Sequence, residues 1–194
     1  MIESSEHFSI MMIFTSIYGV VAYGIIMYVG FIFSGTYLGY SIGSAPIVGY
    51  HYGVDDTNEL KSLFKRSIKL IITTSLIMTL CAELLSRLLA SIFVSYDQAL
   101  LDMTTTAIRL FALSYLISGI NIFASSFFTA LNNGLISATI SFLRTLVFQI
   151  AMIFILPAVF GLNGIWLSVV VAEILSLIVS ILFLYFNRKR YHYV

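Results

Sequence analysis

The sequence predicts an all-α integral membrane protein with five to six transmembrane helices. Its 194 residues are 60% hydrophobic and only 10% charged, and their mean hydropathy is +1.01, whereas soluble domains are about 25% charged. The apolar residues form continuous runs that are long enough to cross ~30 Å of hydrocarbon, which takes about 20 helical residues. Transmembrane β-strands instead alternate polar and apolar residues over about 10 positions. The runs do not alternate, so helices are predicted.

The first apolar run covers residues 8–50 and contains no Asp, Glu, Lys, Arg or His. It is too long for one untilted span and barely long enough for two. We predict a truncated helix within residues 1–18 that runs into a full span over about residues 20–50, so that residues 19–194 form one helical lobe. Two complete spans are the alternative, with Gly19 or Gly24 as the break.

Small residues mark one face of this span near its end. Gly35, Gly39 and Gly43 recur every four residues and Pro46 follows, which places the glycines on one helix face. In lipid such a face lets a neighbouring helix approach closely. Pro46 removes an internal hydrogen bond, so we expect a bend near residues 44–46. The pattern predicts a packing face with a hinge; a packing helix without a hinge is the alternative.

Polar turns divide the rest of the chain into four further spans. The turn at residues 51–60 precedes the first of them, and either Asp56 or Thr57 can cap that helix. The first of these spans ends at about residue 82. The other three cover about residues 103–131, 136–159 and 165–186. Between the first two of these, residues 84–94 are too short to cross the membrane and suit a helix along the interface. Near that helix, we expect the ion pairs Glu83–Arg87 and Asp102–Arg109.

Positive charges predict the orientation of the chain. One cluster of Lys and Arg begins the second span and another follows the last span, at positions 61, 65, 66 and 69 and at positions 188–190. Four crossings separate the clusters, so they share a side, which the positive-inside rule predicts to be the cytoplasm. We therefore expect a multi-pass plasma-membrane protein with a cytoplasmic carboxyl terminus. Labelling of cysteines placed at Asn58 and Asn187 checks this, because both should react from the same side.

Two ionisable residues lie deep inside the predicted spans. Arg144 is ten residues beyond Gly134 and Glu173 is nine beyond Gly164, which places them ~15 Å and ~14 Å into the bilayer from opposite faces. A charge at that depth is costly and usually faces a partner or a water-filled cavity. We predict that the two side chains are in contact. We favour a structural ion pair over a carboxylate that takes up a proton or cation during transport.

Other side chains are candidates for lining a cavity. Tyr37 and Tyr40 are expected to face the helical bundle, because a lipid-facing hydroxyl at depth would lack a partner. Asn121 and Gln149 are candidates for the same lining or for hydrogen bonds between helices. An aromatic cavity suits lipophilic cations.

Several function classes are not expected. The sequence has no nucleotide-binding loop, no His/Cys cluster with metal-ligand spacing and no Ser-His-Asp arrangement, and the formal net charge of +1 gives no basic surface for nucleic acid. We therefore expect neither an enzyme nor a resident metal or cofactor, apart from a coupling H⁺ or Na⁺.

Three stretches resemble one family of transporters. GVVAYGIIMYVGFIF, GYSIGSAPIVGYHYG and the following loop DDTNELKSLFKRS resemble the eighth helix and next loop of multidrug and toxic compound extrusion (MATE) transporters. IRLFALSYLISGINIFASSFFTALNNG resembles the tenth helix of that family, and GLNGIWLSVVVAEILSLIVSI resembles its last helix. The resemblance extends over almost the whole chain from about Gly19.

This resemblance implies two six-helix lobes related by pseudo-symmetry, which export drugs or metabolites in exchange for H⁺ or Na⁺. The chain would be the carboxyl-terminal lobe, half of a twelve-helix transporter. Two features depart from the family. Val170 stands where the family usually has a proline, and the residues before Gly19 are too few for the first helix of the lobe.

We therefore expect the chain to be a partial multidrug antiporter that does not transport alone. The expected partners are the lipid bilayer, the missing amino-terminal lobe or a second copy, and lipophilic or cationic small molecules. One alternative is a fragment of a lipid-linked oligosaccharide flippase of the same superfamily. Another is a non-transporting membrane subunit or the product of a pseudogene.

Overall fold

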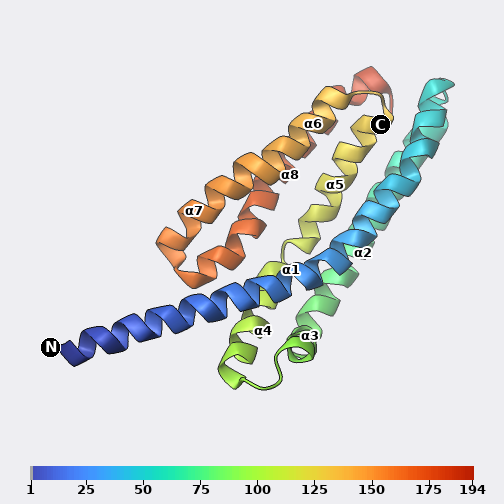
Figure 1. Cartoon of the computed structure of the whole chain (residues 1–194). Helices are drawn as coiled ribbons and strands as arrows, with labels where there is room; N and C mark the ends of the chain where they lie inside the picture. Colours follow the sequence, from blue (N-terminus) through green and yellow to red (C-terminus); the bar gives the residue numbers. More distant parts are fainter. Residues whose placement is uncertain (1) are drawn as a thin grey trace.

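Every described element of the computed structural model is a helix. The structure describes the backbone of residues 2–194 and the side chains of residues 17–194, so the side chains of the expected truncated helix within residues 1–18 lie almost wholly outside the described part. The elements are α1 (Ile2–Gly53), α2 (Thr57–Leu84), α3 (Ser86–Phe93), α4 (Gln98–Ala112), α5 (Tyr115–Ala130), α6 (Gly134–Phe142), η1 (Leu143–Phe148), α7 (Gln149–Phe160) and α8 (Leu162–Tyr191). Figure 1 shows α5 between the long pair α1 and α2 on one side and α6 to α8 on the other.

The described residues contain up to five membrane spans. Ile17–Gly53, α2, Gly134–Phe160 and α8 are each long and apolar enough to cross a membrane, and α4 with α5 passes the same test as one bent span. This confirms the fold class at the lower end of five to six spans. The helix α1 passes through both Gly19 and Gly24 without a break, so neither residue forms the turn that two complete spans would need.

Side chains cap the helices where the turn residues predict. The Asp56 carboxylate accepts a hydrogen bond from the backbone N–H of Glu59, so Asp56, rather than Thr57, is the cap of α2. Asp97 accepts from the N–H groups of the first turn of α4 and also from the Tyr18 hydroxyl. The hydrogen bond from Tyr18 lowers the pKa of the Asp97 carboxyl. These caps satisfy donors at the helix starts that have no partner within the helix.

The span expected over residues 103–131 is two helices instead of one. Their axes differ by 47° at a break that contains no Gly or Pro. Backbone carbonyl groups at the break accept hydrogen bonds from side chains of other helices. The Tyr37 hydroxyl donates to the carbonyl oxygen of Tyr115 at 2.9 Å, and the Thr79 hydroxyl donates to the carbonyl oxygen of Ala112 at 3.5 Å. Side chains that enter a helical ladder in this way are a recognised cause of kinks, and tertiary contacts of this kind have no local sequence signal.

Both ion pairs expected near α3 are wrong. Arg87 pairs with Asp102 at 3.4 Å, and both side chains are more than half exposed. The Arg109 Nε donates instead to the Ser86 hydroxyl at 2.9 Å. Glu83 and Arg87 do not pair because α2 ends at Leu84 and a new helix begins at Ser86, so the two residues do not lie one turn apart on a single helix. The Asp102 carboxylate instead accepts from Arg87 and Gln98. Residues 86–93 form the expected short helix, α3, with Ala90 buried and Leu88 exposed. Its position along the membrane interface stays a prediction.

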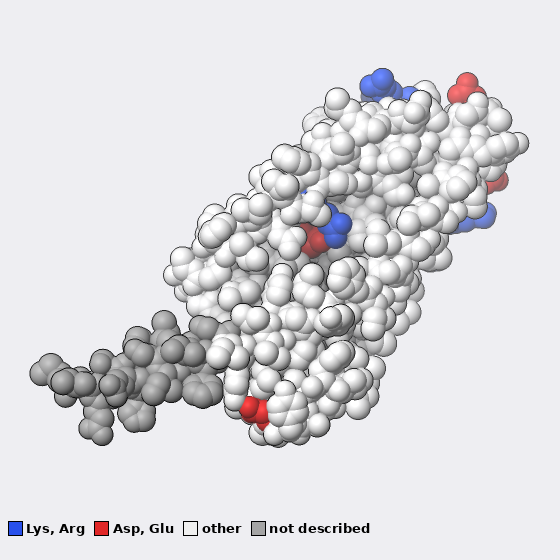
Figure 2. Space-filling model, viewed as in Figure 1, with Lys and Arg blue, Asp and Glu red and all other residues white. Residues whose placement is uncertain are grey.

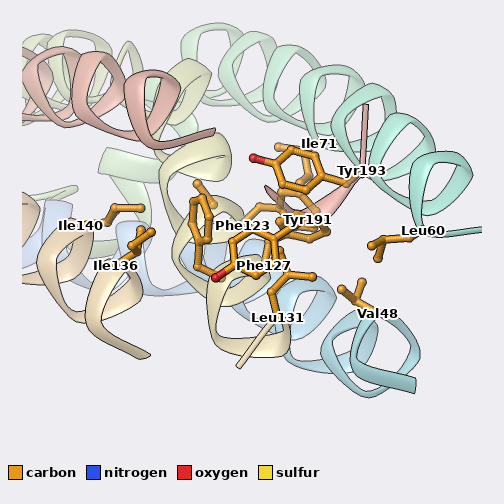
Figure 3. Packing of buried hydrophobic residues seen from close by; sticks show 12 residues of the cluster. Val48, Leu60, Ile71, Phe123, Phe127, Leu131, Ile136, Ile140, Tyr191 and Tyr193 are labelled. Atoms are coloured by element: carbon orange, nitrogen blue, oxygen red, sulfur yellow. The ribbon is translucent and has the colours of Figure 1, made fainter. Parts of the chain in front are cut away.

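An aromatic core lies at the end of the bundle that holds the carboxyl terminus. Phe123 and Phe127 of α5, Tyr191 of α8 and Tyr193 after it are buried together with aliphatic side chains from α1, α2 and α6. Figure 3 shows Tyr193 beside Tyr191 and Phe127. The chain turns back at His192, which has a positive φ of 52°, so that Tyr193 can enter this core.

The two basic clusters lie at the same end of the molecule, as the count of crossings predicts. In Figure 1 the turn between α1 and α2 and the carboxyl terminus lie at one end of the bundle. A pocket of about 270 Å³ joins them, lined by His51 and Tyr52 on one side and by Arg190 and Tyr191 on the other. Which side of the membrane this end faces stays a prediction.

Close backbone contact sets the turn between α7 and α8. Gly161 has a φ of +58°, a conformation that favours glycine. A Cβ placed on Gly164 would lie 2.3 Å from the carbonyl oxygen of Leu156, a position that only glycine can occupy. The two helices therefore form a tight antiparallel hairpin, which brings η1 beside α8.

Candidate functional site

Arg144 of η1 and Glu173 of α8 form a bidentate ion pair. The Arg144 Nη2 donates to Oε1 of Glu173 at 2.7 Å, and Nε lies 2.9 Å from Oε1 and 3.1 Å from Oε2. The Glu173 side chain is 8% exposed and that of Arg144 is 23% exposed. The contact that the helical depths predict is therefore present, in the parallel geometry in which guanidinium and carboxylate bind most strongly.

Asn121 of α5 is the third partner of this pair. Its Nδ2 donates to Glu173 Oε2 at 2.7 Å and to the backbone oxygen of Glu173 at 3.0 Å. Its Oδ1 accepts from the Ser180 hydroxyl at 3.0 Å, and Asn121 is completely buried. The carboxylate thus receives donors from two other helical segments. The network joins α5, η1 and α8 at one point, and Asn121 makes the hydrogen bond between helices that its position predicts.

Arg144 lies in a π-helical turn, Leu143–Phe148, between α6 and α7. The hydrogen bonds of a π-turn span one residue more than those of an α-helix, so the turn rotates the side chains that follow relative to those that precede it. Such turns are rare and occur often at functional sites. The sequence of this segment contains no Gly or Pro that would indicate the irregularity.

A polar cleft of about 300 Å³ adjoins the ion pair, between α1, α5 and the α6–η1 segment. In Figure 2 a blue and a red side chain lie together in a hollow on a face that is otherwise largely uncharged. Leu38, Ile42, Ile122 and Ile140 contribute apolar surface to the cleft. Its polar lining consists of Ser41, Asn121, Ser125, Ser126, Thr129, Ser141 and Arg144.

The hydroxyl groups of this cleft were not among the expected site residues. Ser125 contacts the hydroxyls of Ser137 and Ser141 at 3.0 and 2.8 Å, and Thr129 contacts that of Ser137 at 2.7 Å. A signal for them exists in the sequence, because Asn121, Ser125 and Thr129 recur every four residues and so share one face of a helix. Period-four spacing of polar residues inside an apolar span would have identified this wall.

The expected aromatic lining is not part of this cleft. Tyr37 is 2% exposed, donates to the Tyr115 carbonyl and packs against Gly119. Tyr40 donates to the Ser67 hydroxyl at 2.8 Å and packs against the aromatic core. Both face the bundle, as expected, but toward α5 and α2. Gln149 is partly exposed at the start of α7 and is also outside the lining.

The predicted small face of α1 is exposed in this chain. Gly35, Gly39 and Gly43 lie at the surface, and a Cβ built on any of them would meet nothing within 4 Å. Pro46 is also exposed and lies within the last turns of α1, whereas Figure 1 shows α1 changing direction nearer its middle. The role of these residues in packing and hinge motion stays a prediction.

The geometry makes the site electrically neutral. One positive and one negative side chain neutralise each other, which lowers the cost of keeping each charge inside the membrane. The partly exposed guanidinium and the hydroxyls of the cleft can bind water or a polar group. If a proton or cation were to reach Glu173, it would compete with Arg144 for the same two oxygens.

Comparisons with known proteins identify the family. A family model described as MatE matches residues 2–155, which is most of the chain. The chain belongs to the MatE (MATE) family. The match includes Arg144 and Asn121 but ends before α8, so the family model does not extend to Glu173.

Relatives with curated descriptions support the MATE assignment. The chain is 26% identical over 153 residues to the multidrug export protein MepA of Staphylococcus aureus and 27% identical to MepA of Staphylococcus saprophyticus. Each alignment covers 79% of this chain and 33% of the relative. The chain therefore spans about one third of the length of the curated relatives that it matches.

Solved structures support the same fold. An outward-facing multidrug resistance MATE family transporter of the MOP superfamily aligns with a TM-score of 0.84 at 19% identity, covering 91% of this chain and 40% of that chain. The bent form of the Vibrio cholerae MATE transporter VcmN aligns with a TM-score of 0.81 at 17% identity, covering 89% of this chain and 39% of that chain. The helices of this chain are thus arranged like a part of MATE transporters that is less than half of their length.

Proposed function

We propose that this chain acts as one lobe of a cation-coupled antiporter in the plasma membrane that exports multidrug-type, lipophilic or cationic compounds. It works in this proposal as a transporter component, with no enzymatic step. The support is the family assignment together with the curated relatives, which are named as multidrug export proteins. The observation that carries the proposal is the cleft with a charged pair inside an apolar helical bundle.

We assign the Arg144–Glu173 pair to the architecture of the lobe. Glu173 has two donors, Arg144 and Asn121, on two other helical segments. A carboxylate that must exchange a cation in every transport cycle would have to lose these bonds each time. The pair is better suited to hold α8 against η1 and α5, while the cleft beside it stays accessible.

The cleft argues against a lipid-linked oligosaccharide flippase. Such a chain is expected to line its cavity with several Arg and Lys residues that bind phosphate groups. Among the described residues that line the cleft, Arg144 is the one cationic side chain. The second arginine expected near a span, Arg109, bonds to Ser86 outside this cleft.

Efflux from cells tests the proposal. Cells that express this chain alone should retain a fluorescent cationic dye as well as cells with an empty vector, because the second lobe that would complete the transport path is not supplied. Cells that express a complete transporter containing this lobe should export the dye. Clear efflux by the chain alone would overturn the one-lobe proposal, and a complete transporter that exports no cationic dye would overturn the substrate class.

A further inference from the structure

A row of basic side chains follows one side of α2 from its first turns. Lys61, Lys65 and Lys69 are spaced by four residues, and Arg66 lies beside them. Lys65, Arg66 and Lys69 are exposed. Within residues 17–194, no carboxylate forms a salt bridge with any of these four. The row therefore presents positive charge that the chain itself does not neutralise.

The length of the apolar part of α2 places this row at the membrane surface. Only the 13 residues 70–82 separate Lys69 from Glu83, and they rise ~20 Å along the helix. The hydrocarbon layer is ~30 Å thick. The backbone of Lys69 therefore lies at the level of the acyl chains, and its side chain extends the ammonium group toward the lipid headgroups. Lys65, one turn earlier, lies at the level of the headgroups themselves.

An apolar groove lies between these lysines. It has a volume of about 380 Å³ and is lined by Phe64, Lys65, Ile68, Lys69, Ile72 and Thr73. Phe64, Ile68 and Ile72 recur every four residues, so their side chains form a continuous apolar strip parallel to the basic row. Ile72 is 51% exposed and Ile68 is partly exposed, so this part of the strip is open to a molecule from outside the chain. The Phe64 ring closes the other end of the groove, because it packs against Phe127 and Tyr193.

We propose that this groove is a binding site for an anionic phospholipid. The phosphate lies between the ammonium groups of Lys65 and Lys69, and one acyl chain follows Ile68 and Ile72 toward the interior of the membrane. Charge complementarity selects the occupant, because basic sites at the ends of membrane helices attract anionic headgroups. A free phosphate would leave the apolar strip uncovered. The site does not depend on the transport function proposed above.

Lipid binding to the intact chain tests this site. The detergent-purified chain is mixed with phosphatidylglycerol or with phosphatidylcholine, and the bound lipid is counted by native mass spectrometry. Phosphatidylglycerol should bind more tightly, and its advantage should fall as salt increases, because salt screens exposed charges. Equal binding of the two lipids, or a preference that salt does not change, would overturn the proposal.

A matched pair of variants locates the site. Lys65→Gln/Lys69→Gln removes two charges from the groove, and Arg66→Gln/Lys189→Gln removes two charges outside it, near the start of α2 and the end of α8. Each lysine near an anionic lipid contributes roughly fivefold in affinity, so the groove variant should bind phosphatidylglycerol roughly 25-fold more weakly. The control variant should retain most of the affinity. An equal loss of affinity for phosphatidylglycerol in both variants would show diffuse attraction of the lipid to positive charge instead of a site, and would overturn the proposal. Circular dichroism checks that each variant is helical.

Discussion

Glu173→Leu is expected to lower the free energy of unfolding of the lobe by about 3 to 5 kcal/mol, because it leaves a largely buried Arg144 without its counter-charge. Leucine also removes the acceptor of Asn121, which is completely buried. Glu173→Gln should cost less, since its amide oxygen can still accept a hydrogen bond from Arg144. Unfolding by denaturing detergent, followed by circular dichroism in mixed micelles, measures the difference.

The double variant Arg144→Leu/Glu173→Leu is the control for this prediction. It removes both charges, and Asn121 can still donate to the backbone oxygen of residue 173. Replacing a whole buried pair by apolar residues is often nearly neutral, so the double variant should be more stable than Glu173→Leu. If its loss of stability equals the sum of the losses in the single variants Glu173→Leu and Arg144→Leu, the side chains do not interact and the ion pair is not a structural contact.

Tyr193→Ala should destabilise the lobe by about 3 kcal/mol or more, as is typical when a fully buried aromatic side chain is truncated. Tyr193 has no exposed surface, and its ring lies 4.9 Å from that of Phe64 and 5.0 Å from that of Phe127. Its hydroxyl donates to the carbonyl oxygen of Leu184 at 2.6 Å. Burial raises the pKa of Tyr193, so the hydroxyl stays protonated and remains a donor.

Two neighbouring variants separate the contributions of Tyr193. Tyr193→Phe keeps the ring and loses only the hydroxyl, which should cost about 1 kcal/mol. Val194→Ala changes an exposed side chain and should have little effect. The midpoint of thermal unfolding, measured in one detergent for all variants, gives the order of their stabilities. If Tyr193→Ala has the same unfolding midpoint as the wild type, the segment after α8 does not contribute to the stability of the core.

The sequence alone predicts the features that depend on composition and local chemistry. Runs of apolar residues predict the spans, and Asp56 predicts a helix cap because its side chain binds the next turn. The contact between Arg144 and Glu173 was also predictable, because both depths follow from counting residues and the glycine turn makes the two helices neighbours. Each of these inferences needs only local spacing and the thickness of the membrane.

Features that depend on contacts between distant helices could not be predicted. At the break between α4 and α5, backbone carbonyl oxygens accept hydrogen bonds from the hydroxyls of Tyr37 and Thr79, which come from other helices. The π-helical turn at Arg144 has no breaker residue to announce it. Tyr37 and Tyr40 were expected to line a cavity, but their identity as aromatic residues does not specify which helix they face. The hydroxyl wall at Ser125 was missed although its spacing is visible in the sequence.

The central claim is that the Arg144–Glu173 pair supports the structure of the lobe and does not carry the coupling ion. Transport by Glu173→Gln in a reconstituted full-length transporter that contains this lobe tests it most directly. The variant removes the ionisable carboxylate but keeps an acceptor for Arg144. We expect it to insert and fold normally and to retain most of its cation-driven dye exchange. A variant that folds normally yet loses exchange would contradict the claim and would assign the coupling cation to Glu173.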